Sequence, residues 1–350
     1  MRNFLFLSFI FLCFSCSDNN SNLKIESSLK SGDGPDELHF VFYNVENLFD
    51  VMDDPKKLDD DFTPEGKNNW TEDRYEKKIS QLAKVLKSMT DKHDYLPAVI
   101  GLAEVENKAV VEDLAEALSV SGKEYAVVHE ESADRRGIDV AMMYRKDIFS
   151  EKSHKAFRIK FANMNYRSRD ILYFQGELFN GETVNVFLNH WPSRREGAEV
   201  SEPRRLAAAK TLKSKVDDLL SQDDQSKIII MGDFNDYPDN KSISQVLNAT
   251  GNGKQKSELY NLAYTLNEND KGSYNYRGDW GMLDQAIVSS GFMDGEGLST
   301  TMEGLEIYQE DFMMYYDKKY KEHKPNRTFG HKYFGGYSDH LPIVVEFKMK

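Results

Sequence analysis

Short apolar runs that end in acidic, Asn or His residues constrain this chain more than any other feature of its sequence. Residues 228–231 are entirely apolar, which is typical of a strand buried on both faces, and Asp233 follows them. Residues 38–43 are rich in β-forming side chains and are followed by Asn44. Because the loops at strand ends converge on one edge of an α/β sheet, we expect such side chains to gather in one site.

Hydrophobic periodicity predicts helices among a larger number of strands. In residues 72–89 apolar side chains recur on one face, and Thr71 can cap the helix. Strands that outnumber helices favour two packed sheets flanked by helices, an α/β (α+β) fold formed by one domain at residues 37–350. The predicted helices are residues 72–89, 110–118 and 203–220, and the predicted strands are residues 38–43, 98–103, 139–144, 171–178, 183–188, 228–231, 286–288 and 343–347.

The N-terminus has the pattern of an export signal. A charged start precedes an apolar run at residues 4–14, which is too short for a membrane-spanning helix of about 20 residues. The position of Cys16 resembles that of the lipidated cysteine in bacterial lipoproteins. We expect a lipoprotein-type signal peptide at residues 1–15, lipidation at Cys16 and a flexible tether at residues 16–36. The protein would then be an outer-membrane or cell-surface lipoprotein, or otherwise secreted or periplasmic.

Charge and cysteine content exclude several classes of protein. The net charge of −13 argues against a basic coat protein for nucleic acid, but not against an enzyme that binds phosphate through a metal ion and a local Arg cluster. The two cysteines, Cys13 and Cys16, both precede the domain, so no disulfide can join its parts. Because the domain contains no cysteine and its histidines are scattered along the chain, the sequence argues against a zinc site.

The polar side chains at the strand ends suit a hard metal ion and proton transfer. Carboxylate and Asn oxygens are preferred ligands of Mg²⁺, Mn²⁺ and Ca²⁺. His190 and His340 lie beside predicted strands, and histidine exchanges protons near neutral pH. A single Asp at a strand end is usually a turn former, so the repetition of the pattern carries the prediction. The residues concerned are Asn44, Glu46, Glu104, Glu106, His190, Asp233, Asn235, Asp236, Asp284, Asp339 and His340.

Six short motifs contain all of these residues except Glu106. They are Asn44-Val45-Glu46, Gly101-Leu102-Ala103-Glu104, Asn189-His190-Trp191-Pro192, Met231-Gly232-Asp233-Phe234-Asn235-Asp236, Leu283-Asp284-Gln285 and Ser338-Asp339-His340-Leu341-Pro342. Their order resembles that of the endonuclease/exonuclease/phosphatase superfamily, the deoxyribonuclease I-like proteins, over residues 38–347. The sequence at residues 44–50, 135–141 and 190–194 is similar to that of the branch called predicted extracellular nucleases.

The resemblance implies a fold and a set of roles. The fold is a four-layer α/β/β/α sandwich, in which two packed mixed sheets lie between helices. The cofactor is Mg²⁺, with Mn²⁺ or Ca²⁺ as alternatives, bound by Asn44, Glu104 and Asp339. The implied catalytic residues are His190 for the phosphate or the leaving oxygen, Asp233 and Asn235 for the attacking water, Asp284 to orient a histidine, and His340 as base or phosphate ligand.

Further residues are candidates for recognition and support. Arg194 and Arg195 lie just after His190, and Arg side chains bind phosphate bidentately, although surface ion pairs are the alternative. Asn275 is a candidate for the pocket wall, and Asp139 for support of His190. The insertion at residues 303–337 is rich in aromatic and basic residues, which is typical either of a surface excursion or of a substrate wall.

Together these features predict a metal-dependent phosphodiester hydrolase, in the first place an exported nuclease that cleaves DNA or RNA. A phosphatase or a lipid phosphodiesterase of the sphingomyelinase type is the alternative within the superfamily. A surface binding protein that has lost catalysis is the alternative from another class. A long cationic groove would favour nucleic acid, and a deep pocket a small substrate. We expect a monomer that meets the membrane only through its lipid anchor.

Overall fold

The computed structural model describes residues 34–350 except 94–95, 121, 164 and 250–257. The predicted signal peptide, Cys16 and most of the predicted tether lie outside the described residues. Within the described ranges, no helix has both the length and the apolar character that crossing a bilayer requires.

The first of two large sheets is built around the N-terminal strand. Strand order places β1 between a parallel neighbour, β2, and an antiparallel neighbour, β17, so that the two ends of the domain pair with each other. In order, the sheet contains β13 (Leu298–Ser299), β17 (Ile343–Met349), β1 (Glu37–Leu48), β2 (Val99–Val105), β4 (Asp139–Arg145) and β3 (Tyr125–His129), and β14 (Leu305–Ile307) also pairs with β17.

The second large sheet has six strands and is also mixed. Its parallel pair, β7 and β8, places His190 opposite Asp233, and its other neighbours are antiparallel. In order, the sheet contains β5 (Phe149–Phe157), β6 (Ile171–Leu178), β7 (Thr183–His190), β8 (Lys227–Asp233), β12 (Asp284–Ser289) and β9 (Leu259–Asn261). Two separate hairpins pair β10 (Tyr274–Tyr276) with β11 (Asp279–Gly281), and β15 (Met314–Asp317) with β16 (Glu322–Pro325).

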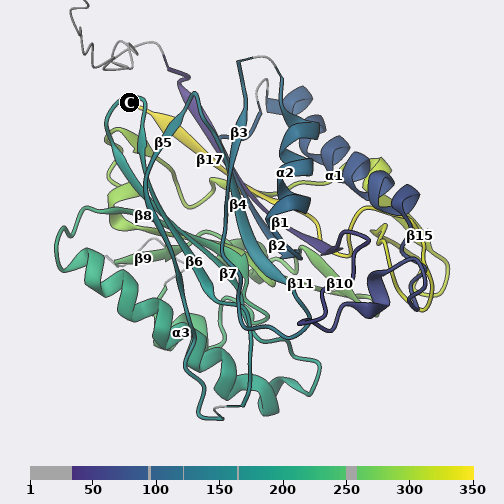
Figure 1. The fold of residues 1–350 in the computed structure, drawn as a ribbon. Coiled ribbons are helices and arrows are strands. Elements are labelled where there is room, and N and C mark those ends of the chain that lie inside the picture. Colours follow the sequence, from purple (N-terminus) through teal and green to yellow (C-terminus); the bar gives the residue numbers. More distant parts are fainter. Residues whose placement is uncertain (1–33, 94–95, 121, 164, 250–257) are drawn as a thin grey trace, which may run out of the picture.

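Helices cover the outer face of each sheet. α1 (Glu72–His93) and α2 (Lys108–Leu118) lie on one side of the strands, and α3 (Ala198–Leu220) lies on the other, as Figure 1 shows. A further helix, α4 (Tyr264–Glu268), is short. The predicted four-layer α/β/β/α sandwich is therefore confirmed.

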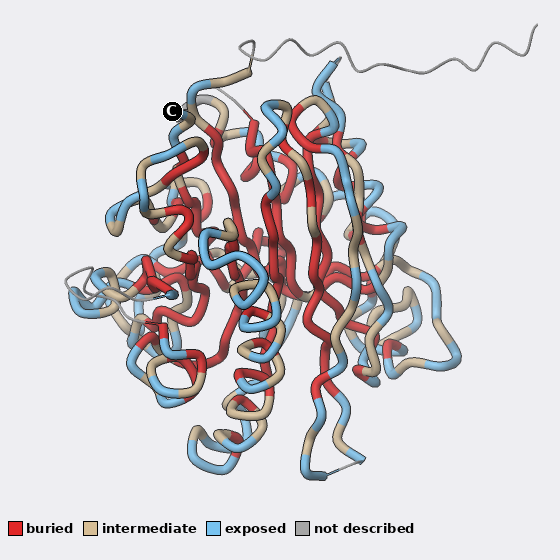
Figure 2. Tube along the Cα trace, turned by 90° about the vertical axis from the view of Figure 1, so that its left-hand side faces the viewer, coloured by how far each residue is buried: buried red, intermediate tan, exposed pale blue. Residues whose placement is uncertain are grey.

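Each boundary between layers has its own apolar core, because alternate side chains of a strand face opposite sides of the sheet. Phe42 and Leu188 are fully buried between the two sheets, whereas the adjacent Val41 faces α1 and α2. Leu212 of α3 packs on the outer face of the second sheet beside Ile230. Buried positions accordingly concentrate on the strands in Figure 2, and exposed ones on loops and on the outer sides of helices.

Helix boundaries follow local signals with one difference. Asn107 caps α2, since its side chain accepts a hydrogen bond from the Val110 N–H. α3 begins at Ala198 and contains Pro203, whereas the sequence analysis placed the start at this proline. The sequence analysis relied on the preference of proline for the first turn of a helix. Within α3, Pro203 removes only one backbone hydrogen bond, and the helix therefore continues past it toward the N-terminus.

Candidate active site

Strand ends from both sheets bring the predicted site residues together. His190 ends β7 and Asp233 ends β8, while Asp284 begins the antiparallel β12 and lies opposite Asp233. Asn44 lies on β1 of the other sheet, and its Nδ2 donates a hydrogen bond to Asp233 Oδ2 over 3.1 Å. This contact joins the two sheets at the site.

Two irregular residues turn carboxylates out of the first sheet. The pairing of β2 with β4 shifts register between Ala103 and Val105, and Glu104 at this shift has a φ of 65°. Glu46 lies at a similar shift in β1 with a φ of 51°. A positive φ is uncommon outside glycine and often marks a functional site. The Asn47 N–H donates to Glu104 Oε2 over 3.1 Å and fixes the redirected side chain.

A buried histidine–aspartate pair lies on one side of Asp233. His340 Nδ1 lies 2.6 Å from Asp284 Oδ2, and its Nε2 lies 4.0 Å from Asp233 Oδ2. Burial opposes a positive charge on His340, but the carboxylate of Asp284 outweighs it and raises the pKa of His340 to about 10. The Tyr274 ring packs on the imidazole with a centroid distance of 4.6 Å. His340 is therefore held as an imidazolium in a fixed orientation.

A second histidine, His190, also lies beside Asp233, and its pKa is shifted in the opposite direction to that of His340. His190 Nε2 lies 3.6 Å from Asp233 Oδ2 and 3.9 Å from Glu104 Oε1. Burial, reinforced by the positive charge of Arg169, lowers the pKa of His190 well below its ordinary value. Burial and the nearby Asp284 raise the pKa of Asp233 to about 7. Asp233 thus lies between a neutral imidazole and a charged one.

The three predicted metal ligands fit a hard divalent ion. Burial and the negative charge of Asp339 raise the pKa of Glu104, so the two carboxylates repel each other across a shared space. A divalent cation between them would relieve this repulsion. Asn44 Oδ1 accepts a hydrogen bond from the Glu46 N–H and retains a second lone pair. Oxygen donors of this kind suit Mg²⁺ or Mn²⁺.

Asn235 is held beside Asp233 by the turn that follows β8. Its backbone N–H donates to Asp233 Oδ1 over 3.0 Å, and its φ of 50° is left-handed. Its side-chain Nδ2 donates to the Trp191 carbonyl over 3.1 Å. The turn therefore links the motif around Asp233 to the motif around His190.

The predicted substrate-binding residues lie around the site without touching its catalytic side chains. Arg194 is half-buried and stacks on the Tyr237 ring, 4.8 Å from its centroid, while Arg195 is exposed. Asn275 accepts a hydrogen bond from the Gly278 N–H and donates to Glu322 Oε1 over 3.4 Å. Asn275 thus stabilises the β10–β11 hairpin.

The insertion at residues 303–337 supplies site residues that the sequence analysis missed. Arg327 Nη2 lies 2.8 Å from Glu46 Oε1 and 2.9 Å from Asp339 Oδ2, which places a guanidinium beside a predicted metal ligand. The Thr328 N–H donates to Glu46 Oε2 over 2.6 Å. Burial and the charge of Asp339 raise the pKa of Glu46 to about 7. Glu46 lies more than 280 residues before its partners Arg327 and Thr328, and no local spacing could have revealed these contacts.

Another arginine network supports the end of β7. Asp134 accepts a fork of hydrogen bonds from Arg136 and a further one from Arg169 over 3.1 Å. Arg169 is buried and donates to the carbonyl of His190 over 3.0 Å. Arg136 is about half exposed, with 52% of its side chain accessible. Burial opposes its charge, but the hydrogen bond and charge of Asp134, with a smaller contribution from Glu104, raise the pKa of Arg136. Arg136 is therefore a candidate phosphate ligand at the rim.

Comparison with known proteins places this geometry in context. The chain matches the Endonuclease/Exonuclease/phosphatase family over residues 39–349. No curated protein sequence matches it. Solved structures share the fold at low identity.

Three of these structures illustrate the kinds of protein that share the fold. An endonuclease/exonuclease/phosphatase family protein from Bacteroides thetaiotaomicron is 17% identical, with a TM-score of 0.56 and coverage of 91% of this chain and 99% of that chain. TDP2 from D. rerio, complexed with a single strand DNA product, is 14% identical, with a TM-score of 0.54 and coverage of 89% and 99%. The mannosyl-6-phosphatase from Bacteroides thetaiotaomicron is 17% identical, with a TM-score of 0.52 and coverage of 89% and 99%.

Proposed function

Because this chain belongs to the endonuclease/exonuclease/phosphatase family and is a hydrolase of phosphate esters, we propose that it is a divalent-metal-dependent nuclease that acts outside the inner membrane. The observation that carries the chemistry is the placing of Asp233 between the His340–Asp284 pair and the neutral His190. Hydrolysis of a phosphate ester needs a base for water and positive charge for the phosphoryl oxygens, and these residues supply both.

The metal ligands and the general base have separate tasks. A divalent ion held by Glu104, Asp339 and Asn44 would neutralise charge on the phosphoryl oxygens. The carboxylate of Asp233 accepts a proton from the attacking water and orients it toward phosphorus. Asn44 Nδ2 donates to that carboxylate over 3.1 Å and fixes its direction.

The two histidines hold the phosphate from opposite sides. His340 is an imidazolium whose Nδ1 is engaged by Asp284, so its Nε2–H is free to donate to a phosphoryl oxygen. His190 is a neutral imidazole and donates a single N–H without adding charge. Donors placed where negative charge develops stabilise the transition state more than the ground state.

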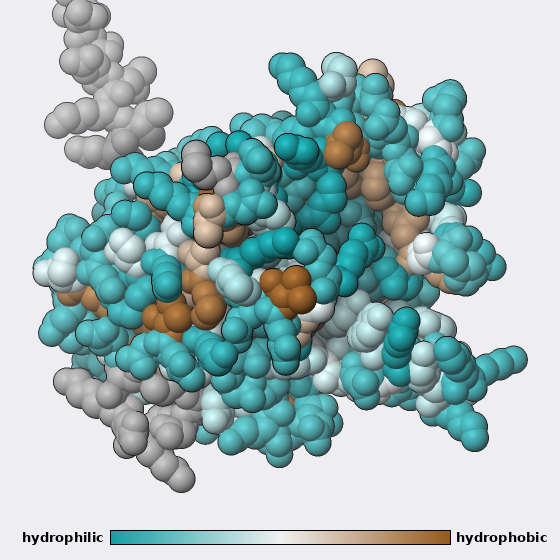
Figure 3. All heavy atoms as spheres, turned by 90° about the horizontal axis from the view of Figure 1, so that it is seen from below, coloured by the Kyte–Doolittle hydropathy of each residue, from teal (hydrophilic) through white to brown (hydrophobic). Residues whose placement is uncertain are grey.

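The character of the surface favours an anionic substrate over a lipid. Figure 3 views the molecule from below, the side toward which β1 runs in Figure 1, and this face is mainly hydrophilic with hydrophobic side chains in small, separate groups. Arg136, Arg194 and Arg195 supply positive charge near the strand ends. A nucleic acid presents a row of phosphates to such residues, and its binding would weaken with added salt.

A panel of substrates tests this proposal. The purified protein is assayed with Mg²⁺ on plasmid DNA, RNA, bis-p-nitrophenyl phosphate, p-nitrophenyl phosphate and sphingomyelin vesicles, with His340→Ala alongside. We expect cleavage of nucleic acid and of the diester, lost in the variant. Cleavage of the monoester or of sphingomyelin alone would replace the nuclease by a phosphatase or a lipid phosphodiesterase. Hydrolysis of none of them would favour the binding protein.

The proposed location rests on the N-terminal sequence. The apolar run at residues 4–14 and the cysteine at position 16 support export and lipid anchoring. In a bacterial host, palmitate labelling should mark the wild-type chain and a Cys13→Ser control, but not Cys16→Ser. Labelling of the Cys16→Ser chain would contradict the anchor.

A further inference from the structure

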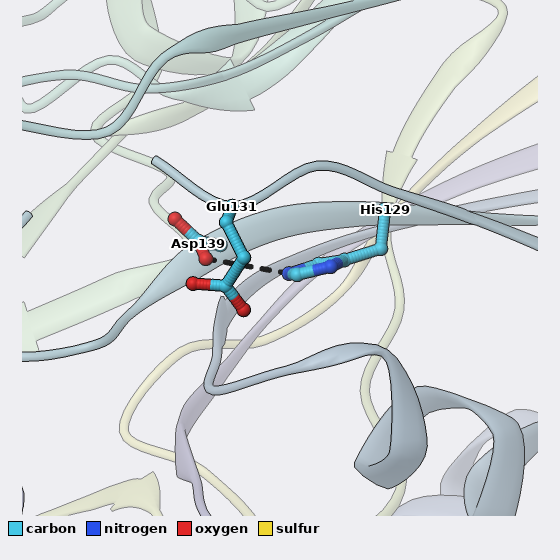
Figure 4. A group of neighbouring side chains, drawn as sticks. All are labelled: His129, Glu131 and Asp139. Atoms are coloured by element: carbon cyan, nitrogen blue, oxygen red, sulfur yellow. Dashed lines mark ion pairs between the residues drawn. The ribbon is translucent and has the colours of Figure 1, made fainter. Parts of the chain in front are cut away.

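A second group of metal-ligating side chains lies where β3 passes into β4. His129 ends β3, Asp139 begins β4, and Glu131 lies in the loop between them. His129 pairs with Ala141, so Asp139, two residues before Ala141, projects from the same face as His129. Figure 4 shows the three side chains pointing toward one another, and one donor atom from each lies within 4.8 Å of the others.

Two of these donors are buried without a hydrogen-bond partner. The side chains of His129 and Asp139 are only 4% and 1% exposed, and Nε2 and Oδ2 lie 3.3 Å apart. Neither atom has a hydrogen-bond partner among the described residues. Buried polar atoms that lack a hydrogen bond are rare and call for an explanation. Two ligands of a tetrahedral metal ion at about 2.0–2.1 Å are separated by about 3.3 Å, which is the spacing found here.

The third donor opens the group to solvent and adds negative charge. The side chain of Glu131 is 55% exposed, and its Oε2 lies 2.9 Å from Lys57 Nζ. Two carboxylates, Glu131 and Asp139, face one ammonium, Lys57, in this group, so acidic side chains outnumber basic ones. A dication is therefore attracted to the group, and it can enter from the side of Glu131.

We propose that His129, Glu131 and Asp139 form a binding site for a divalent transition-metal ion of the Zn²⁺ type. An imidazole with two carboxylates suits Zn²⁺ or Mn²⁺ better than Mg²⁺, which prefers oxygen ligands and water. Three protein ligands leave a position for water. This donor set differs from the predicted Mg²⁺ ligands Asn44, Glu104 and Asp339.

The site would position a loop of the active-site rim. The chain between Glu131 and Asp139 also carries Asp134 and Arg136, and an ion bound at both ends of this segment would fix it. The role of the ion is therefore structural, and it does not depend on the reaction proposed above.

Zinc binding by the purified protein tests the assignment. Titration calorimetry with Zn²⁺ is done in saturating Mg²⁺, which occupies the predicted active-site ligands. We expect one Zn²⁺ per chain for the wild type and for Glu130→Gln, a matched control whose carboxylate instead faces His154 over 3.2 Å. Glu131→Gln should weaken the affinity at least tenfold, because it removes one ligand. Glu104→Gln should leave this binding unchanged.

A Co²⁺ spectrum supplies a second readout. His129→Gln should abolish the visible absorption bands of bound Co²⁺ that depend on a nitrogen ligand, and thermal unfolding shows whether that variant is folded. If it is not, Glu131→Gln still decides, because its side chain is exposed. The proposal is overturned if the wild type binds no Zn²⁺, or if Glu131→Gln binds it as tightly as the wild type does. Neither result bears on phosphoester hydrolysis.

Discussion

At the scale of single residues, one charged and one neutral histidine flank the same carboxylate, Asp233. Asp284 holds His340 as an imidazolium, whereas burial and Arg169 keep His190 neutral. The difference arises from the partner of each ring, because both side chains are buried. The site therefore has two hydrogen-bond donors beside Asp233: His340, which is charged, and His190, which is neutral.

The role of Asp284 gives the first prediction. Asp284→Asn removes the charge that holds the His340 proton, and hydrolysis should fall about 10²–10³-fold, within the range for loss of acid–base groups. The pKa of His340 should fall as well, which NMR titration of the imidazole measures. Asp279→Asn, an exposed change in the β11 hairpin, is the matched control. Wild-type hydrolysis by Asp284→Asn would contradict this role.

Asp134 gives a prediction on stability. Burial opposes its charge, but the hydrogen bond from Arg136 and the charge of Arg169 hold its pKa below the usual range. Its stabilising contribution is therefore present above the unfolded pKa of about 3.9 and is lost as the pH falls through the lower folded value. Asp134→Asn should cost about 3–5 kcal/mol at pH 7, because it leaves Arg169 buried without its counter-ion.

Thermal unfolding measured from pH 7 to pH 3 checks the sign. The difference in Tm between wild type and Asp134→Asn should be largest at neutral pH and shrink below about pH 4. Asp239→Asn, a change at an exposed carboxylate, should have little effect at any pH. A difference that grows as the pH falls would show that Asp134 is not stabilised in its charged form.

At the scale of elements, the insertion at residues 303–337 is fastened to the domain by a buried lysine. Lys78 of α1 donates to Thr328 Oγ1 over 2.5 Å and to the Tyr337 carbonyl over 2.6 Å. Burial lowers the pKa of Lys78 to about 8. The same segment carries Arg327, which contacts Glu46 and Asp339. α1 thereby determines where one wall of the site lies.

Lys78→Met tests this attachment. The variant keeps about the same side-chain volume but removes the hydrogen bonds that Lys78 donates to Thr328 and to the Tyr337 carbonyl, which should destabilise the protein by about 1–3 kcal/mol. Limited proteolysis should then cut the segment at residues 314–335 faster than in wild type. Lys77→Met, an exposed neighbour on the same helix, should behave as wild type. Equal cutting rates for both variants would contradict the role of Lys78.

The sequence was informative for elements with strong periodicity and less so for edge strands. The positions of α1, α2, β6 and β8 follow from apolar patterns that burial maintains. β5, with the sequence FSEKSHKAF, lies at the edge of its sheet and is half exposed, so it lacks the alternation by which strands are recognised. β15 and β16 form a hairpin within the insertion, which carries charged and aromatic residues rather than a strand pattern.

At the scale of the whole molecule, the packing of two sheets explains why the site could be anticipated in part. Residues at strand ends were predicted to converge, and the Asn44–Asp233 contact across the sheets does bring them together. Arg327, Lys78 and Asp134 could not be assigned from sequence, because their contacts with Glu46, Thr328 and Arg169 join residues that are 281, 250 and 35 positions apart. Asp139, the candidate support for His190, instead lies 3.3 Å from His129.

We propose that Glu104, which its left-handed backbone turns out of β2, holds a metal ion required for hydrolysis. Hydrolysis of bis-p-nitrophenyl phosphate is measured with Mg²⁺ and with EDTA for wild type, Glu104→Gln and Glu106→Gln. Glu106 is the matched control, since it lies two residues away and binds the Asp50 N–H over 2.8 Å. We predict that EDTA and Glu104→Gln each reduce the rate at least 100-fold and that Glu106→Gln retains it. Hydrolysis that survives both EDTA and Glu104→Gln would contradict a metal ion bound by Glu104.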